Sequence, residues 1–281
     1  MKRYLYGWAM IALVGLSACS KENPTETDPP KLEIRADIAA MTKAPQLNED
    51  GSGAFASGDA FTVLSHHPIS EATSTFDYQV GATEMYWQNL NLPSDQGTVD
   101  FFACYPTQSL ADGSFDFDLE QVENPDLLLA STQSVKIGTE SVAMTFQHAM
   151  HRLVVRFSTD PSYASAADIQ TICTAKSTCR VNLRDGSIDN SSTRKASFTS
   201  YGQTATFLIV PQKSSDVSLT IHVGSDIKTI QLSDLLPSID QLETGKQLSV
   251  SLSVKEGKVE LEGAMIEGWG DQGSIDGSII M

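Results

Sequence analysis

Residues 142–157, VAMTFQHAMHRLVVRF, contain two strand patterns whose apolar positions are out of step. In the first pattern the apolar side chains occupy even positions, from Val142 to Phe146, and in the second they occupy odd positions, from Leu153 to Phe157. Because side chains of a strand alternate between two faces, one unbroken strand would turn its core face outward in between. We therefore expect a bulge near His148, or a strand that leaves one sheet and enters another.

The same two-residue alternation recurs along most of the chain. Clusters of Gly, Asn, Asp, Ser and Pro, which favour turns, separate the short apolar runs. The other runs are Leu32–Ile34, Phe61–Val63, Val99–Phe101, Phe207–Ile209, Val217–Val223, Leu248–Val254 and Val259–Leu261. Helical periodicity is scarce, with Ala164–Cys173 and Ile230–Leu236 as short candidates. The pattern predicts a mainly β protein built from antiparallel β-sandwiches.

The beginning of the chain has the layout of a secretory signal. Lys2 and Arg3 precede an apolar run that is too short to span a bilayer, and small residues then lead to Cys19. The ending Leu16-Ser17-Ala18-Cys19 resembles the bacterial lipobox, in which the cysteine thiol receives a diacylglycerol. We expect residues 1–18 to be a lipoprotein signal peptide and Cys19 to be the lipid attachment site. The alternatives are an ordinary signal peptide cut nearby and a membrane anchor.

The remaining chain divides into a spacer and two expected domains. Residues 19–31 are polar and proline-rich, which is typical of a flexible segment. The change of apolar face near His148 then marks a boundary. We expect an N-terminal β-sandwich domain over residues 32–145 and a C-terminal β-sandwich domain over residues 146–281. No apolar stretch of about 18 residues follows the signal, so no second membrane crossing is expected.

Charge and motif content exclude several classes of function. The formal net charge of the 281-residue chain is −16, and it becomes −18 when Lys2 and Arg3 leave with the signal. Such a charge repels phosphate backbones, so nucleic acid is not an expected partner. No nucleophile elbow, phosphate-binding loop or dinucleotide fingerprint is present. His148 and His151 are three apart, so on one strand they point oppositely and cannot chelate one ion. We expect a protein that is not an enzyme and has no cofactor or metal.

Three cysteines follow Cys19 in a chain that is expected to leave the cytoplasm. Cys173 and Cys179 enclose five residues, a spacing that allows a hairpin-like disulfide, and the alternative is that both remain free. Cys104 lies in the apolar run VDFFACY and is expected to behave as a small buried hydrophobe.

Several local patterns, taken in order, resemble one family. They are AMTKA at 40–44, Gly58-Asp59, Tyr86-Trp87, VDFFACYP at 99–106, PDLLLA at 125–130, the stretch at 142–155, FLIVPQ at 207–212, Leu242–Gly245 and IEGW at 266–269. The most specific are FQHAM at 146–150 and VPQ at 210–212. On these residues the chain is identified as a member of the fimbrillin family of Bacteroidetes lipoproteins.

That resemblance implies a fold, a location and an assembly route. The fold is two tandem transthyretin-like β-sandwich domains, and the function is that of a pilus subunit in cell adhesion, as stalk, tip or anchor. Family precursors cross the envelope as lipoproteins and reach the outer membrane surface. A trypsin-like protease then removes the N-terminal segment, and the groove left behind accepts a strand from another pilin subunit. No receptor is implied.

Carried onto this chain, the resemblance makes residues 32–43 a removable first strand. The matching processing site is the bond between Lys43 and Ala44, where better-known members carry Arg in place of Lys. Arg35 is an alternative, but a cut there would fall inside the strand. Excision would uncover apolar side chains and unpaired backbone groups, which favour strand addition. A member that is not cut would act as a membrane anchor or cap.

Two further features leave alternatives open. The apolar ending Ile279-Ile280-Met281 is consistent with a donor strand and equally with an edge strand that closes the C-terminal domain. Tyr86, Trp87 and Trp269 are candidates for stacking on sugars, although core packing is the commoner role of aromatic residues in strands. The competing function is therefore a monomeric outer-membrane lipoprotein that binds a glycan or another ligand.

Overall fold

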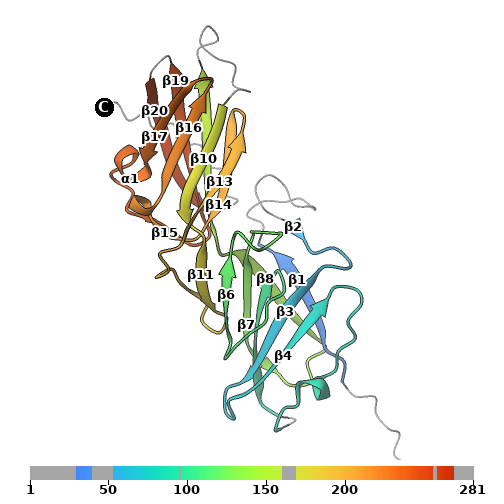
Figure 1. Ribbon diagram of the computed structural model, residues 1–281. Helices are drawn as coiled ribbons and strands as arrows, with labels where there is room; N and C mark the ends of the chain where they lie inside the picture. Colours follow the sequence, from blue (N-terminus) through green and yellow to red (C-terminus); the bar gives the residue numbers. More distant parts are fainter. Residues whose placement is uncertain (1–29, 40–52, 95, 160–168, 256–257, 269–281) are drawn as a thin grey trace, which may run out of the picture.

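The computed structural model describes residues 30–39, 53–94, 96–159, 169–255 and 258–268. The first part of the chain forms a seven-stranded sheet in the order β2-β1-β8-β7-β5-β3-β4 (Figure 1). Its strands are β1 Glu33–Ile38, β2 Gly53–Ala54, β3 Ala60–His67, β4 Ala72–Gln79, β5 Thr98–Tyr105, β7 Leu128–Lys136 and β8 Ser141–His148. The short helix η1, Trp87–Leu90, lies between β4 and β5 in the chain.

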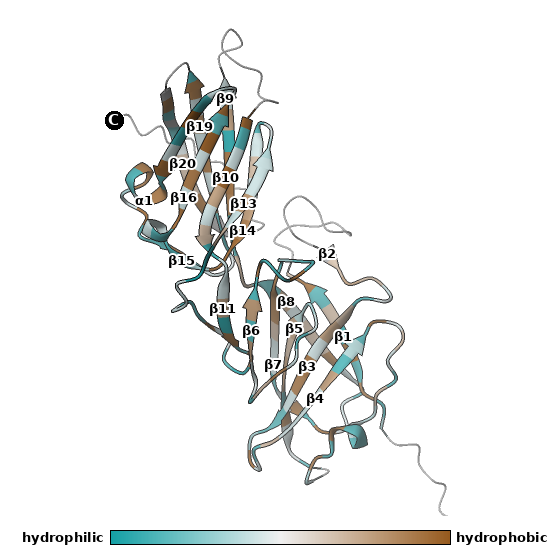
Figure 2. Ribbon diagram, in the orientation of Figure 1, coloured by the Kyte–Doolittle hydropathy of each residue, from teal (hydrophilic) through white to brown (hydrophobic). Residues whose placement is uncertain are grey.

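The second part of the chain forms two four-stranded sheets. One has the order β14-β9-β19-β20 and the other the order β13-β10-β16-β17. Their strands are β9 His151–Thr159, β10 Ile169–Lys176, β13 Lys195–Tyr201, β14 Thr204–Ile209, β16 Ser218–Val223, β17 Asp226–Gln231, β19 Lys246–Lys255 and β20 Lys258–Gly268. Apolar and polar stretches follow one another along these strands, as Figure 2 shows.

A three-stranded sheet joins residues from both parts of the chain. It has the order β12-β11-β6, and its strands are β6 Ser114–Asp118, β11 Thr178–Asn182 and β12 Ser187–Asp189. Strand β11 pairs with β6 from Thr178–Asp118 to Asn182–Ser114, so a hairpin from the second part is fastened to the first. The remaining elements are short: β15 Gln212–Lys213, β18 Gln241–Leu242, η3 Ser214–Asp216 and α1 Leu232–Leu235.

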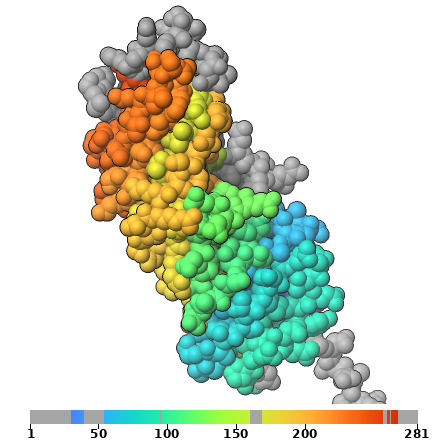
Figure 3. Space-filling model, viewed as in Figure 1, coloured from blue at the N-terminus to red at the C-terminus, as the bar shows by residue number. Residues whose placement is uncertain are grey.

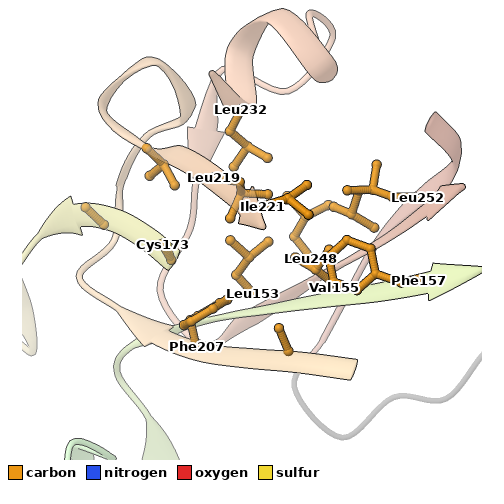
Figure 4. Close-up of a cluster of buried hydrophobic side chains, with 14 of the residues drawn as sticks. Leu153, Val155, Phe157, Cys173, Phe207, Leu219, Ile221, Leu232, Leu248 and Leu252 are labelled. Carbon is orange, nitrogen blue, oxygen red and sulfur yellow. The ribbon is translucent and has the colours of Figure 1, made fainter. Parts of the chain in front are cut away.

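Three clusters of buried side chains hold these sheets together. The N-terminal cluster draws on β1, β3, β5, β7, β8 and η1 and includes Phe61, Phe101 and Phe146. The C-terminal cluster is shared by the two four-stranded sheets, and Figure 4 shows Leu153, Phe207, Ile221 and Leu248 converging there, among others. The middle cluster packs the three-stranded sheet against the other face of β3 and β5. The molecule is elongated as a result (Figure 3).

The chain changes sheet between β8 and β9, which confirms the predicted change of face. Strand β8 ends at His148 in the seven-stranded sheet, and β9 begins at His151 in a four-stranded one. Gly245 fits close to this junction. Its φ is +65°, and a Cβ placed there would lie 2.9 Å from the His148 carbonyl oxygen, so the position requires glycine.

Every apolar run that predicted a strand overlaps a strand of the structure. Of the two helix candidates, one contains a short helix and the other, where it is described, does not. Residues 232–235 form the single turn α1 within the predicted Ile230–Leu236 segment. The helix expected over Ala164–Cys173 is wrong where it can be judged, because β10 begins at Ile169. Along β10, the buried positions Ile169, Thr171 and Cys173 alternate with half-buried ones, which is the period of a strand. Ile169 and Thr171 are also β-branched, and such residues favour strands. Among the described residues, no helix is long and apolar enough to cross a membrane.

Cys173 and Cys179, for which a disulfide was one expectation, are both free thiols in the structure. The sequence interpretation required a hairpin between them, but β10 and β11 run on with only Ser177 between them. Cys173 lies in the C-terminal cluster and Cys179 in the middle cluster. Along extended strands, six residues span roughly 20 Å, far beyond the reach of a disulfide. Cys104 is fully buried, as predicted.

We predict that these three thiols are inert while the protein is folded. Burial raises the pKa of Cys104, Cys173 and Cys179 to about 12, so almost none is thiolate at about pH 8. A Cys19→Ser chain treated with iodoacetamide should gain no label when native and three labels in urea, as measured by intact mass. Labelling of the native chain would contradict the burial. Only one label in urea would indicate that two of the cysteines are bonded.

Candidate functional site

Strand β1 is held in the sheet mainly by one neighbour. It pairs in parallel with β8 over six residue pairs, from Glu33–Ser141 to Ile38–Phe146. On its other side it pairs with β2 only at Asp37 and Ile38. The Ala39 amide donates to the Phe146 carbonyl oxygen at 2.7 Å and ends the contact. We call the β8 edge that pairs with β1, together with the apolar surface that β1 covers, the first-strand seam.

Strand β8 depends on β1 more than on its other neighbour. Its ladder to β7 contains two pairs, Leu128–His148 and Leu129–Gln147, whereas its ladder to β1 contains six. Farther along, the Thr132 hydroxyl donates to the Ala143 carbonyl oxygen at 2.5 Å. Without β1, most of the β8 edge would therefore lose its ladder partner, and unpaired backbone groups favour the addition of a new strand.

Apolar side chains of the segment 32–38, which includes β1, close the N-terminal cluster. Leu32, Ile34 and Ile38 are buried there, while Glu33 and Arg35 face outward and form an ion pair at 3.4 Å. The three apolar side chains belong to the same cluster as the rings that surround Phe146. Those ring pairs have centroids 4.8 Å apart for Phe55–Phe146 and 5.1 Å apart for Phe61–Phe146.

Polar contacts fix the beginning of β1. The Leu32 amide donates to the Met85 carbonyl oxygen at 2.8 Å, and the Ile34 amide donates to the Tyr78 hydroxyl at 3.3 Å. The Trp87 amide donates to the Pro30 carbonyl oxygen at 3.1 Å. These contacts come from segments other than β8. They therefore fix the position of a strand in the seam independently of its ladder to β8.

The energy of the seam is comparable to the stability of a whole domain. Burying one Leu or Ile side chain contributes about 1.5–3 kcal/mol, so Leu32, just before β1, together with Ile34 and Ile38 in β1 contributes roughly 5–9 kcal/mol. A typical domain has about 5–15 kcal/mol of total stability. A chain that lost β1 would therefore need another strand in the seam to remain folded.

The sequence-predicted modification and processing residues lie mostly outside the described part of the chain. Cys19, Lys43 and Ala44 fall in the ranges 1–29 and 40–52. Arg35 is described and lies in the middle of β1, opposite Ala143. A protease needs the backbone of its substrate free and extended, so a cut at Arg35 would require β1 to leave the sheet first.

Of the aromatic candidates for sugar stacking, Trp87 is part of the core. Trp87 is 4% exposed and belongs to the N-terminal cluster, and its indole nitrogen donates to the Thr139 carbonyl oxygen at 2.8 Å. Tyr86 is half-buried and precedes η1. Trp269 and the apolar ending at 279–281 lie outside the described residues. The exposed aromatic residue that sequence reasoning missed is Tyr201, which is 70% exposed.

The two histidines at the change of sheet have separate structural roles. His148 Nδ1 lies 2.8 Å from Asp126 Oδ1, and His151 Nδ1 donates to the Glu243 carbonyl oxygen at 2.9 Å. His151 is fully buried, and its Nε2 has no hydrogen-bond partner. Within the described ranges, no group of three or more His, Cys, Asp or Glu is placed to hold a metal ion.

We predict that His151 makes the fold sensitive to acid. Burial lowers its pKa below the usual 6.5, although the bond to the Glu243 carbonyl opposes this. As the pH falls through about 6.5, the unfolded chain takes up a proton that the folded chain does not, so stability is full above that pH and declines below it. In His151→Met, the Tm should fall less between about pH 7.5 and 5 than in the parent chain. An equal or larger fall would contradict this role.

One open pocket of about 410 Å³ lies over the outer face of β7 and β8. It extends to the turn between β11 and β12, and its lining is mostly polar: Ser131, Gln133, Thr145, Gln147, Arg184, Asp185 and Thr244 contribute side chains. The polar face of β8 thus lines this pocket, while its apolar face lies in the N-terminal cluster.

Comparison with known proteins gives one family and a set of similar folds. A sequence model described as fimbrillin-like matches residues 39–269. The crystal structure of a candidate cell adhesion protein from Bacteroides uniformis has a TM-score of 0.62 at 17% identity, over 85% of this chain and 99% of that one. One from Bacteroides ovatus has a TM-score of 0.63 at 16% identity, over 86% and 98%. No curated protein matches the chain in sequence.

Proposed function

The chain belongs to the fimbrillin-like family, and from this premise we propose that it is a structural subunit of a surface pilus that joins its neighbours by strand exchange. In this proposal β1 is a temporary occupant of the first-strand seam. Proteolysis removes it, and a strand from another subunit takes its place. The uncut chain is the monomeric precursor.

The observation that carries the proposal is the dependence of β8 on β1. Six ladder pairs to β1 against two to β7 mean that loss of one short strand leaves an edge ready for pairing. The same loss uncovers the sites of Leu32, Ile34 and Ile38 in the N-terminal cluster. An incoming strand would gain both main-chain hydrogen bonds and apolar burial, which is the usual basis of strand addition.

We further propose two tandem transthyretin-like β-sandwich domains, with the boundary moved from the expected 145/146 to the end of β8 at His148, because Phe146 belongs to the N-terminal sheet and cluster. A repeated topology supports this division. In the first part β1 pairs in parallel with the late strand β8, and in the second part β9 pairs in parallel with the late strand β19. Of β1 and β9, β1 is the one that a single cut would release. Residues 40–52 separate it from β2 in the sequence, whereas β9 follows β8 after two residues.

The proposed route places the chain on the outer membrane before assembly. Cys19 carries the lipid, the spacer 19–31 reaches from the membrane, and a trypsin-like protease cuts between Lys43 and Ala44. The cut separates the anchor and β1 from the rest. A role in cell adhesion is consistent with the description of the similar Bacteroides structures. A copy that escapes the cut would serve as an anchor or cap.

Strand replacement can be tested with a peptide. A synthetic peptide of residues 30–39 should bind the processed chain and restore slow amide exchange in β8, because it rebuilds the parallel ladder. A control peptide with Asp at positions 34 and 38 should not restore it. Fast exchange in β8 with the native peptide, slow exchange with the control peptide, or slow exchange in the processed monomer without any peptide would contradict the proposal.

A further inference from the structure

The sheet β13-β10-β16-β17 carries an outer face with an unusual composition. Direct partners in antiparallel strands point to the same side, so the register defines three rows that run across all four strands. We call these twelve side chains the neutral face: Tyr201, Gln170, His222 and Ile227; Thr199, Ile172, Thr220 and Thr229; Ser197, Thr174, Ser218 and Gln231.

The neutral face contains no Asp, Glu, Lys or Arg, although the whole chain has 35 acidic residues and a net charge of −16. The strand β13 accordingly shows intermediate hydropathy in Figure 2. Most of the side chains are hydroxyls or amides, with Tyr201 and Ile227 exposed at the two ends of one row.

Cross-strand hydrogen bonds order the polar groups of the face. The Gln170 amide nitrogen donates to the Tyr201 hydroxyl at 3.0 Å, so the phenol ring is oriented although it is 70% exposed. The hydroxyls of Thr220 and Thr229 are 3.0 Å apart, and those of Thr174 and Ser197 are 2.9 Å apart. In each of these two hydroxyl pairs, one hydroxyl donates to the other. The second hydroxyl proton and the remaining oxygen lone pairs are left for hydrogen bonds to a ligand.

Two lysines at one edge of the face are paired with the same carboxylate. Lys176 and Lys195 lie beyond the third row and both approach Asp216, at 3.4 and 3.7 Å. Lys176 also donates to the Asn190 carbonyl oxygen, at 2.9 Å, and Lys195 to the Asp216 carbonyl oxygen, at 2.7 Å. These two cations are therefore already engaged.

We propose that the neutral face binds an uncharged polysaccharide. Hydroxyl and amide rows match the hydroxyls of sugars, and an ordered, exposed tyrosine ring at the end of a row gives an apolar surface for a sugar ring. The charge balance favours a neutral polymer, because the strongly acidic chain repels anionic ones. The inference is independent of the proposed pilus function, because this sheet packs on the C-terminal cluster and contains neither β1 nor β8.

A second copy of the chain fits this face less well. Four strands and three rows cover roughly 19 by 20 Å, or about 400 Å². A stable protein interface buries about 800 Å² on each partner and has an apolar centre. The centre of the neutral face is the row that holds Ile172 among three threonines, so it is too small and too polar for a stable dimer.

Affinity electrophoresis of the full chain tests the proposal. The probes are dextran, laminarin, mannan and galactomannan cast into native gels, with polygalacturonate as an anionic control. At least one neutral polymer should retard the chain, and polygalacturonate should not. Tyr201→Ala should weaken the retardation about tenfold, as expected for an aromatic hot spot, and Tyr201→Phe should largely preserve it. Thr229→Glu, which places a carboxylate in the middle row, should also abolish binding.

Ile69→Ala is the matched control, because Ile69 is 86% exposed in the turn between β3 and β4. It should migrate like the parent chain in every gel. Migration unaffected by all four neutral polymers would overturn the proposal, as would retardation that survives both Tyr201→Ala and Thr229→Glu. Self-association that depends on Tyr201 would overturn it in favour of a second copy. Failure of strand exchange, in contrast, would leave these results unchanged.

Discussion

Trypsin should cut the purified chain first between Lys43 and Ala44, and the product should then assemble into a ladder of oligomers. The cut separates β1 from β2, which pairs with it at only two residues. Once β1 dissociates, the β8 edge and the sites of three buried apolar side chains are open. Their burial is worth roughly 5–9 kcal/mol, so refilling the seam from another subunit is strongly favoured. Gel electrophoresis without boiling measures the ladder.

Two controls separate strand exchange from aggregation. Lys43→Gln should resist the early cut and remain monomeric, because Arg35 is protected by the β1–β8 ladder. An excess of the peptide of residues 30–39 should hold the processed chain as a monomer by occupying the seam. An early cut at Arg35, or a processed chain that stays folded and monomeric without peptide, would contradict the account.

Replacing Ile34 by Asp should detach β1 without any protease. Ile34 is 5% exposed and its side chain lies in the N-terminal cluster. The substitution removes its apolar contribution and places a carboxylate among apolar side chains, which together should cost roughly 3–5 kcal/mol. Urea unfolding should show a lower midpoint, and the intact chain should form oligomers.

Arg35→Ala is the matched control for this substitution. It is the next residue on the same strand, but its side chain is exposed and forms an ion pair with Glu33. Surface changes of this kind usually alter stability by less than about 0.5 kcal/mol. Equal midpoints for Ile34→Asp and the parent chain would show that the seam does not depend on β1 as proposed.

The sequence predicted the strands well because their signal is local. Alternating apolar residues at 142–146 and 153–157 fixed two strands, and their change of parity placed the switch of sheets that β8 and β9 show. The helix expected over Ala164–Cys173 failed because it rested on few residues. In β10, the alternation of buried and half-buried positions prevailed instead.

Pairing between strands could not be read in the same way, because it depends on residues far apart in the chain. Nothing local to Glu33–Ile38 indicates that it runs parallel to β8. The joining of β11 to β6 was missed for the same reason, and with it the separation of Cys173 from Cys179. The neutral face likewise exists only through the register of four strands. The sequence made Trp87 a candidate for stacking on sugars, but Trp87 is buried. The exposed Tyr201 was not predicted as a candidate.

The most direct test of strand release is N-terminal sequencing and mass measurement of the protein recovered from the surface of the cells that make it. The account predicts a chain that begins at Ala44, without Cys19, its lipid or β1, and that migrates as oligomers unless it is boiled. A recovered chain that still begins at lipidated Cys19 and is monomeric would contradict it.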